Sequence, residues 1–274
     1  MDRQEFRPRL HGSLERIALL DFLLTCRTGL HIGAGKSTDL AGSDQPVLRD
    51  ATGRPLVPGS SLRGILRTGV EALCRAAGID KTFADPGTAT GGLLPEVAEI
   101  LPHWRELDPV ERLFGAAADG PGGFSYASRL QISDALCGTP IAVELRDGVG
   151  IERDSRTAAT GIKFDLEVVP AGTRFRGVIR FKNPADFELG LLAQALWMLD
   201  SGALLLGGKS ARGLGWVGVE IMAPRFIAPA DILAGAPETP SDRTFGSVEE
   251  KLSDFLATLK RLVREAGASR QPAA

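Results

Sequence analysis

Cysteine, long apolar runs and net charge are all scarce in this chain of 274 residues, and each scarcity excludes a class of protein. The three cysteines, Cys26, Cys74 and Cys137, lie far apart and form no CxxC pair, so neither a disulfide framework nor a zinc site is expected. No run reaches 18 apolar residues, because the longest candidate, Ile17–Leu24, is interrupted by Asp21. A transmembrane helix is therefore not expected. The charged first 12 residues hold no apolar signal-peptide core. The odd number and wide spacing of the cysteines favour a reducing cytoplasm as the location.

The charges nearly cancel, with 32 basic against 34 acidic residues and a net charge of −2. A balanced total does not indicate nucleic-acid binding, so any basic surface has to be local. Only seven of the basic residues are lysines and 25 are arginines. Arginine suits planar, bidentate contacts to phosphate better than lysine does, although genome base composition also produces an arginine excess.

Hydrophobic periodicity predicts an α+β protein with four strands and four helices. Alternation of apolar and polar side chains indicates the strands, and apolar residues three or four apart indicate the helices. The expected strands are the second half of Leu14–Thr28, then Arg129–Leu136, Thr173–Phe181 and Leu214–Met222. The first expected helix begins after Pro58 and ends at Gly78. The other three cover Asp108–Gly115, Ala185–Ser201 and Ser247–Glu265.

Without its insertions this order is βαββαβ, which predicts a modified ferredoxin-like or RNA-recognition-motif fold. We place the core at residues 12–225, with an insertion at 79–128 and a projecting hairpin, the thumb, at about 141–167. Residues 226–274 form a linker and a last helix. The apolar residues of that helix, from Val248 to Leu262, recur at helical spacing. They are expected to pack either on their own domain or on another subunit.

Two nucleotide-binding motifs occur in part or in the wrong context. GAGKST at residues 33–38 resembles a P-loop, but the first glycine of that motif would have to stand at residue 30, which is Leu30. Gly213–Gly218 matches GxGxxG, but it leads into a predicted strand instead of a helix. An NTPase is therefore a minor alternative.

Three other segments combine small residues with a cation or a hydroxyl. They read GLHIGAGKS at residues 29–37 (followed by GSDQPV at 42–47), PLVPGSSLRG at 55–64 with Arg67 one turn on, and LGGKSARGLG at 206–215. Glycine lets backbone N–H groups approach a phosphate closely, and lysine or arginine adds charge. Residues 49–67 hold four arginines and one acid, and residues 203–218 hold two cations and no acid, so both are local basic patches.

Taken together, these segments resemble the RAMP superfamily, and within it the Csm/Cmr-type backbone subunit of type III CRISPR effector complexes. Five motifs of that family occur here in the family order. They are GLHIGxG at residue 29, D-x-P-V at Asp44, PGSSL-[KR]-G at Pro58, an I-[DE]-R…T-A thumb core at Ile151 and GGxxxRGxG at Gly207.

The resemblance implies a subunit that lines up along a CRISPR guide RNA and presents it to a complementary target RNA. The expected partners are both RNAs, further copies or paralogous RAMP subunits, and other effector-complex subunits, with no membrane. The resemblance also implies that Asp44 is required for target-RNA cleavage with Mg²⁺ or another divalent cation, which makes the chain an endoribonuclease within the complex. A non-catalytic RNA-binding scaffold is the alternative.

The candidate RNA-binding residues follow from the motifs and the basic patches. At each position a structural role stays open: Asp44 as a turn cap, His31 as a structural histidine, the Ser60 region as an ordinary helix cap, and the glycine loop as a tight turn. The candidates are His31, Gly33, Gly35, Lys36, Ser37, Ser60, Ser61, Arg63, Arg67, Arg153, Arg156, Gly208, Lys209, Arg212 and Gly213.

Overall fold

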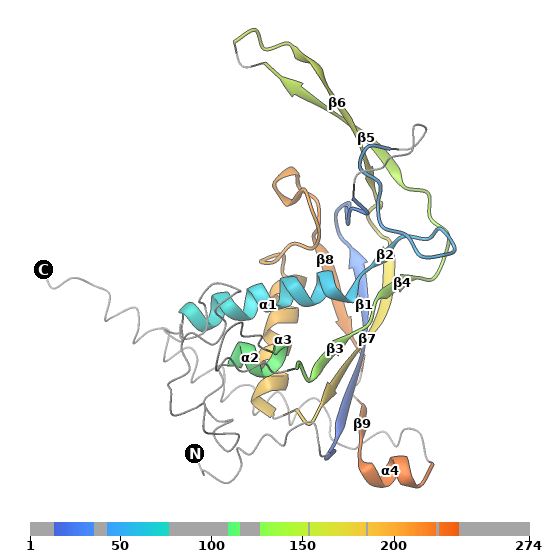
Figure 1. Ribbon diagram of the computed structural model, residues 1–274, viewed down its shortest axis with the longest axis vertical. Coiled ribbons are helices and arrows are strands. Elements are labelled where there is room, and N and C mark those ends of the chain that lie inside the picture. Colours follow the sequence, from blue (N-terminus) through green and yellow to red (C-terminus); the bar gives the residue numbers. More distant parts are fainter. Residues whose placement is uncertain are drawn as a thin grey trace, which may run out of the picture.

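The structure, a computed structural model, describes residues 14–35, 43–76, 109–115, 127–152, 154–184, 186–222 and 225–235 (Figure 1). It combines helices with antiparallel strands, which form a seven-stranded sheet and a separate two-stranded hairpin. The strands are β1 (Ile17–Cys26), β2 (Leu56–Val57), β3 (Leu130–Ile132), β4 (Ala135–Cys137), β5 (Glu144–Ile151), β6 (Ala158–Val168), β7 (Arg174–Lys182), β8 (Val217–Ile221) and β9 (Arg225–Ile227). The α-helices are α1 (Gly59–Ala76), α2 (Pro109–Phe114), α3 (Asp186–Asp200) and α4 (Pro229–Leu233), and a 3₁₀ turn, η3, covers Ser210–Arg212.

Strand β1 lies inside the sheet and determines its order. It pairs with β7 along most of its length, from Ile17 opposite Lys182 to Thr25 opposite Arg174. On its other side it pairs with β8 in its second half and with β9 in its first. Beyond β7 lie β3 and β4, and β2 forms the far edge beside β4. The order is therefore β2-β4-β7-β1-β8, with every pair antiparallel.

Helices α1 and α3 cover one face of the sheet, and the core lies between them and that face (Figure 1). Because successive side chains of a strand point to opposite faces, alternate residues of β1 such as Leu20 and Phe22 reach this core. Leu62 and Leu66, one turn apart on α1, are buried in the same core. Gly177 of β7 makes room for Phe22, since a Cβ there would lie 2.4 Å from its ring.

The predicted elements within the described residues are confirmed in kind and order, with one break. The strand expected over Arg129–Leu136 is two strands, because Ser133 Oγ accepts the Val178 N–H and the next residue, Asp134, accepts the N–H of Gly59. Three short elements, β2, β9 and α4, were not predicted, and the sheet continues through β9 beyond residue 225. The last predicted helix and most of the insertion at 79–128 lie outside the described residues.

No helix in the described part of the chain is both long and apolar enough to cross a membrane.

Arg129 and Glu188 form a buried ion pair between the start of β3 and α3, with side chains 1% and 0% exposed. Arg129 also donates to Asn183 O at 2.6 Å. We expect Arg129→Met to lower the free energy of unfolding by about 3–5 kcal/mol, because the buried Glu188 carboxylate then loses the positive charge of Arg129. Urea denaturation measures this loss.

Arg146 provides the control for that substitution. It pairs with Glu144 where both side chains are about half exposed, at 47% and 48%. Arg146→Met should cost less than about 1 kcal/mol, because water screens the pair. If both variants lost the same free energy of unfolding, burial would not be what makes the Arg129–Glu188 pair stabilising.

Candidate functional site

Three loops meet at the root of the β5–β6 hairpin, which projects from one end of the sheet (Figure 1). They are residues 29–35 after β1, residues 43–47, and the glycine loop 207–213 before β8. Together with Phe164–Val168 at the end of β6, we call them the loop cluster. Asp44, His31, Lys209 and Arg212 all belong to it, so the fold brings together candidates that are as many as 181 residues apart in the sequence.

The loop at residues 29–35 is fixed by main-chain hydrogen bonds on two sides. Leu30 and Val169 exchange N–H···O bonds of 2.9 and 2.8 Å, which attach the loop to the chain that leaves β6. On the other side, Ala34 N–H donates to Pro46 O at 2.9 Å. The backbone here forms isolated bridges instead of a regular strand, as the glycine-rich sequence predicted.

Asp44 is exposed, and it stands on the edge of β6. Its Oδ2 accepts the backbone N–H of Asp165 at 3.0 Å. Gln45 continues this pairing, because its N–H donates to Asp165 O and its own carbonyl accepts the Glu167 N–H, both at 3.1 Å. The carboxylate is thus held by one oxygen at a defined place while its side chain remains open to solvent.

Glu167 joins the Asp44 segment to the root of the thumb. Its Oε2 accepts the Val47 N–H at 2.9 Å and an Arg49 guanidinium N–H at 3.0 Å. A charged acceptor makes both bonds stronger than neutral ones. Glu167 therefore helps to set the position of Asp44, three residues before Val47.

His31 is buried, with 6% of its surface exposed, and links two loops of the cluster. Its Nδ1 lies 2.8 Å from Glu167 O, and since a carbonyl only accepts, Nδ1 carries the proton. Its own carbonyl accepts the Gly208 N–H at 2.9 Å. Nε2 faces Gly33, where an added Cβ would lie 3.2 Å from it. The histidine thus joins the loop at residues 29–35 to the end of β6 and to the glycine loop.

Lys209 and Arg212 of the glycine loop gather over the ring of Phe164. Their charged groups lie 5.9 and 5.2 Å from its centroid, within the range of cation–π attraction. The same ring lies close to Gly148 of β5, where an added Cβ would lie 2.3 Å from it. Lys209 has a left-handed backbone (φ 63°), and so does Gly213 (φ 81°), which makes this turn tight.

The candidates on α1 lie elsewhere, beside the β2–β4 edge of the sheet, whereas the glycine loop leads into β8 at the opposite edge. The N-terminus of α1 already has an anion, because Gly59 N–H donates to Asp134 Oδ1 at 2.8 Å. Ser60 is exposed and Ser61 is half-buried on the first turn.

Arg63 and Arg67 interact with neighbouring parts of the protein. The guanidinium of Arg63 donates to Phe114 O at the end of α2, and burial, with the Arg67 charge adding to it, lowers the pKa of Arg63. Arg67 donates to Glu71 one turn further on, at 2.8 Å. The structure therefore does not bring these two arginines into the loop cluster.

The remaining candidates are on the thumb or outside the described residues. Arg156 is exposed in the turn between β5 and β6, with a left-handed backbone (φ 54°). Gly35 ends the described part of its loop, also with a positive φ (97°). Lys36, Ser37 and Arg153 lie outside the described residues.

Sequence reasoning missed Phe164, Glu167 and Gly207, which hold the cluster together. Phe164 and Glu167 belong to a strand of alternating apolar and polar residues. Such a pattern predicts which side chains are buried, but it does not predict which residues they contact. The sequence had one signal for Gly207, the GG pair of its motif. Its φ is 81°, and an added Cβ would lie 2.4 Å from His31 O.

The loop cluster can supply few metal ligands. It therefore fits only a metal ion that takes most of its ligands from the substrate and from water. Among the described residues no group of three or more histidine, cysteine or acidic side chains stands ready to hold a metal. Mg²⁺ is commonly held by one or two carboxylates together with substrate phosphates and water. The exposed Asp44 fits that mode, since Asp165 N–H engages only one of its oxygens.

Two strongly shifted groups lie outside the cluster. Burial, with a contribution from Cys137, raises the pKa of the Cys26 thiol to about 12, so it stays neutral and is no nucleophile. Hydrogen bonds, first from the Thr52 hydroxyl and then from the Arg54 backbone, lower the pKa of Asp50 to about 2 and stabilise the turn at residues 50–54.

Comparison with known proteins identifies the family of the chain. The sequence model of the RAMP superfamily matches residues 23–218, and the chain therefore belongs to that superfamily. Among curated proteins, it is 45% identical over 214 residues to a protein of Methanocaldococcus jannaschii, covering 74% of this chain and 78% of that protein. A protein of Enterococcus italicus is 36% identical over 225 residues, covering 75% and 89%. Both relatives are named "CRISPR system Cms endoribonuclease Csm3".

We expect Gly207→Ala to destabilise the protein more than Gly213→Ala. Both residues have a φ of 81°, so either alanine is strained by about 1–2 kcal/mol. Only at Gly207 does the new Cβ also collide with the backbone, at His31 O, whereas nothing lies within 4 Å at Gly213. Chemical denaturation of both variants measures the difference, and equal losses would contradict the close approach of the two loops.

Proposed function

We propose that this chain is the guide-RNA-binding backbone subunit of a type III CRISPR effector complex and that it cleaves complementary target RNA. The observation that carries the proposal is the similarity to two relatives named as CRISPR endoribonucleases, which extends over about three quarters of the chain. The loop cluster supports it, because an exposed carboxylate and two cations are held around consecutive residues of β6.

In this proposal the cations and the glycine backbone hold phosphates. Lys209 and Arg212 supply positive charge, and their loop is free of acidic residues. The thumb projects beyond the sheet and is well placed to separate successive stretches of a bound strand (Figure 1). RNA cleaves itself when its 2′-oxygen lies in line with the scissile phosphate, so a protein that holds this geometry accelerates the reaction.

Asp44 is the proposed catalytic residue. Its free oxygen is placed to accept a proton from the attacking hydroxyl or to bind a divalent cation together with a phosphate. Such a cation, when bound, stabilises negative charge on the phosphate oxygens. Asp165 N–H and the pairing of Gln45 with β6 keep the carboxylate in position without neutralising it.

We further propose that the core is a modified ferredoxin-like fold of the RNA-recognition-motif type. The strand order β4-β7-β1-β8, all antiparallel, supports this, with α1 and α3 as the two crossover helices. The proposed partners are the guide RNA, the target RNA, further copies or paralogous RAMP subunits and other effector-complex subunits. The three free, buried cysteines fit the cytoplasm as the place of action.

We expect Asp44→Ala, assembled into the complex, to reduce metal-dependent target cleavage by at least about 100-fold, because general acid–base help of this kind is worth 10²–10⁴-fold. Guide binding and assembly should be unchanged, since the side chain is exposed. Cleavage of a labelled target RNA is measured with Mg²⁺ and with a chelator.

Asp231→Asn is the matched control, since Asp231 only accepts the Ala228 N–H at the start of α4, outside the loop cluster. It should cleave at the wild-type rate. Undiminished cleavage by Asp44→Ala would reject the catalytic assignment and leave the RNA-binding scaffold as the function.

We expect the double variant Lys209→Ala, Arg212→Ala to bind single-stranded guide RNA more weakly and with a smaller salt dependence. Each lost phosphate contact should lower the slope of log K against log salt by about 0.7. Fluorescence anisotropy at several KCl concentrations measures the slope. Arg225→Ala, at an ion pair with Asp21, should keep the wild-type slope. An unchanged slope in the double variant would contradict phosphate contact by the glycine loop.

A further inference from the structure

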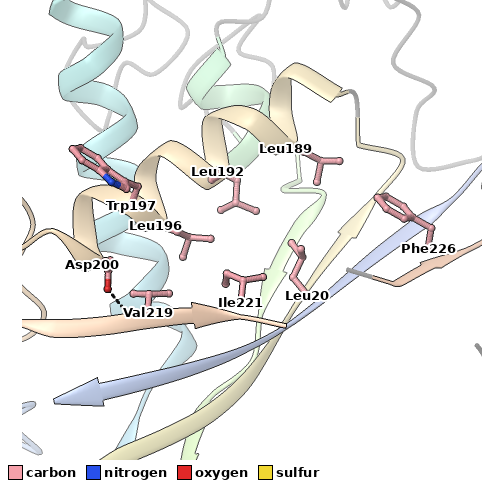
Figure 2. A pocket seen from close by; sticks show the side chains of 10 residues that line it. Leu20, Leu189, Leu192, Leu196, Trp197, Asp200, Val219, Ile221 and Phe226 are labelled. Carbon is pink, nitrogen blue, oxygen red and sulfur yellow. Dashed lines mark hydrogen bonds between the residues drawn. The ribbon is translucent and has the colours of Figure 1, made fainter. Parts of the chain in front are cut away.

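An apolar groove of about 230 Å³ lies between α3 and the adjoining strands β1, β8 and β9 (Figure 2). Asp200, at one end, is its only charged lining residue. In Figure 2 the leucines of α3 face the side chains of the strands across this space, while Trp197 points away from the strands at the outer side of α3. The lining residues are Leu20, Leu189, Leu192, Ala193, Leu196, Trp197, Asp200, Val219, Ile221 and Phe226.

Part of the apolar lining of the groove is open to solvent. Trp197 is 60% exposed, although its helix is otherwise largely buried. Val219, Ile221 and Phe226 are only partly buried. A contiguous apolar patch with a large aromatic residue generally marks a surface that another segment or another molecule covers.

The chain itself contains a segment of matching character after the described residues. Val248, Leu252, Phe255, Leu259 and Leu262 lie four, three, four and three positions apart, which predicts a helix with one apolar face. Ser247 and Glu250 have the spacing of a capping box before it, and Gly267 follows it as a stop signal. Such a helix needs a cover for its apolar face.

We propose that the helix expected at Ser247–Glu265 docks along this groove, beside α3, within the same chain. The dimensions agree. The groove extends along α3 from Leu189 to Asp200, about 17 Å at 1.5 Å per residue, and the stripe from Val248 to Leu262 is about 21 Å long. This inference does not depend on the proposed function.

The connection is also long enough. The described chain ends at Gly235, shortly after β9, which provides Phe226 at one end of the groove. Residues 236–246 then span up to about 35–40 Å when extended. The shortest path places the start of the helix near Phe226, and its basic last turns, with Lys260, Arg261 and Arg264, near Asp200. Asp200 already pairs with Arg27, at 2.9 Å, so the docking depends on apolar contact and on the length of the connection.

A cysteine pair tests the contact in the full-length chain. Ala193 lies in the middle of the groove lining and Phe255 in the middle of the apolar stripe, so Ala193→Cys with Phe255→Cys should be joined by mild oxidation whichever way the helix runs. The three native cysteines are buried and interfere little. The expected product is an intramolecular disulfide whose yield does not depend on protein concentration, seen as a shifted monomer on a non-reducing gel.

The matched control is Ala193→Cys with Ser253→Cys, since Ser253 is on the opposite side of the predicted helix and should not be joined. A disulfide-linked dimer from the first pair would overturn the proposal in favour of a second copy as occupant. Equal yields from the two pairs, or no product from either, would also overturn it.

A second measurement uses stability. Leu252→Asp should lower the thermal midpoint by at least about 4 °C and increase the binding of a hydrophobic dye, because it uncovers the groove. Ser253→Asp introduces the same side chain on the polar face and should change neither. Equal effects of the two variants would contradict docking through the apolar stripe.

Discussion

Main-chain pairing between the loop after β1 and the end of β6 is the constraint on which the loop cluster depends. Leu30 and Val169 exchange two hydrogen bonds, and the pairing of Gln45 with Asp165 and Glu167 adds a second segment to the same stretch of backbone. Because these partners are backbone atoms, the side chains of Phe164 and Glu167 add to a pairing that the main chain already makes. The thumb, the Asp44 segment and the glycine loop consequently share one rigid support.

The arginines show why counting charges could not locate this site. Arg129 is buried against Glu188, and Arg63 donates to the end of α2, so these two stabilise the packing of helices. Lys209 and Arg212 instead lie over the face of Phe164. An aromatic face attracts cations without neutralising them, which leaves their charge available to a phosphate.

Much of the architecture could be predicted because its elements obey local rules. The helix at Gly59–Ala76 and the strand at Arg174–Lys182 carry clear periodicity and clear breakers. The two-residue β2 is too short to show a period, and the break between β3 and β4 depends on Ser133 and Asp134 bonding to distant partners. The same limit applies to the site. Motifs identified Asp44 and the glycine loop, whereas the buried state of His31 and the position of Arg63 beside α2 follow only from tertiary packing.

The extent of the sheet also explains why α1 and α3 do not cover its whole face. Helix α3 lies over β1 and β8, but β9 extends the edge to where Phe226 stands at the end of the groove. Helix α4 has only five residues, and Leu233 on it is exposed, so within the described chain nothing longer than α4 follows β9. Covering the apolar side chains at this edge stabilises the fold, by about 25 cal/mol for each Å² of apolar surface removed from water. The groove and the loop cluster lie on different parts of the fold, so a cover over α3 leaves the root of the thumb free for RNA.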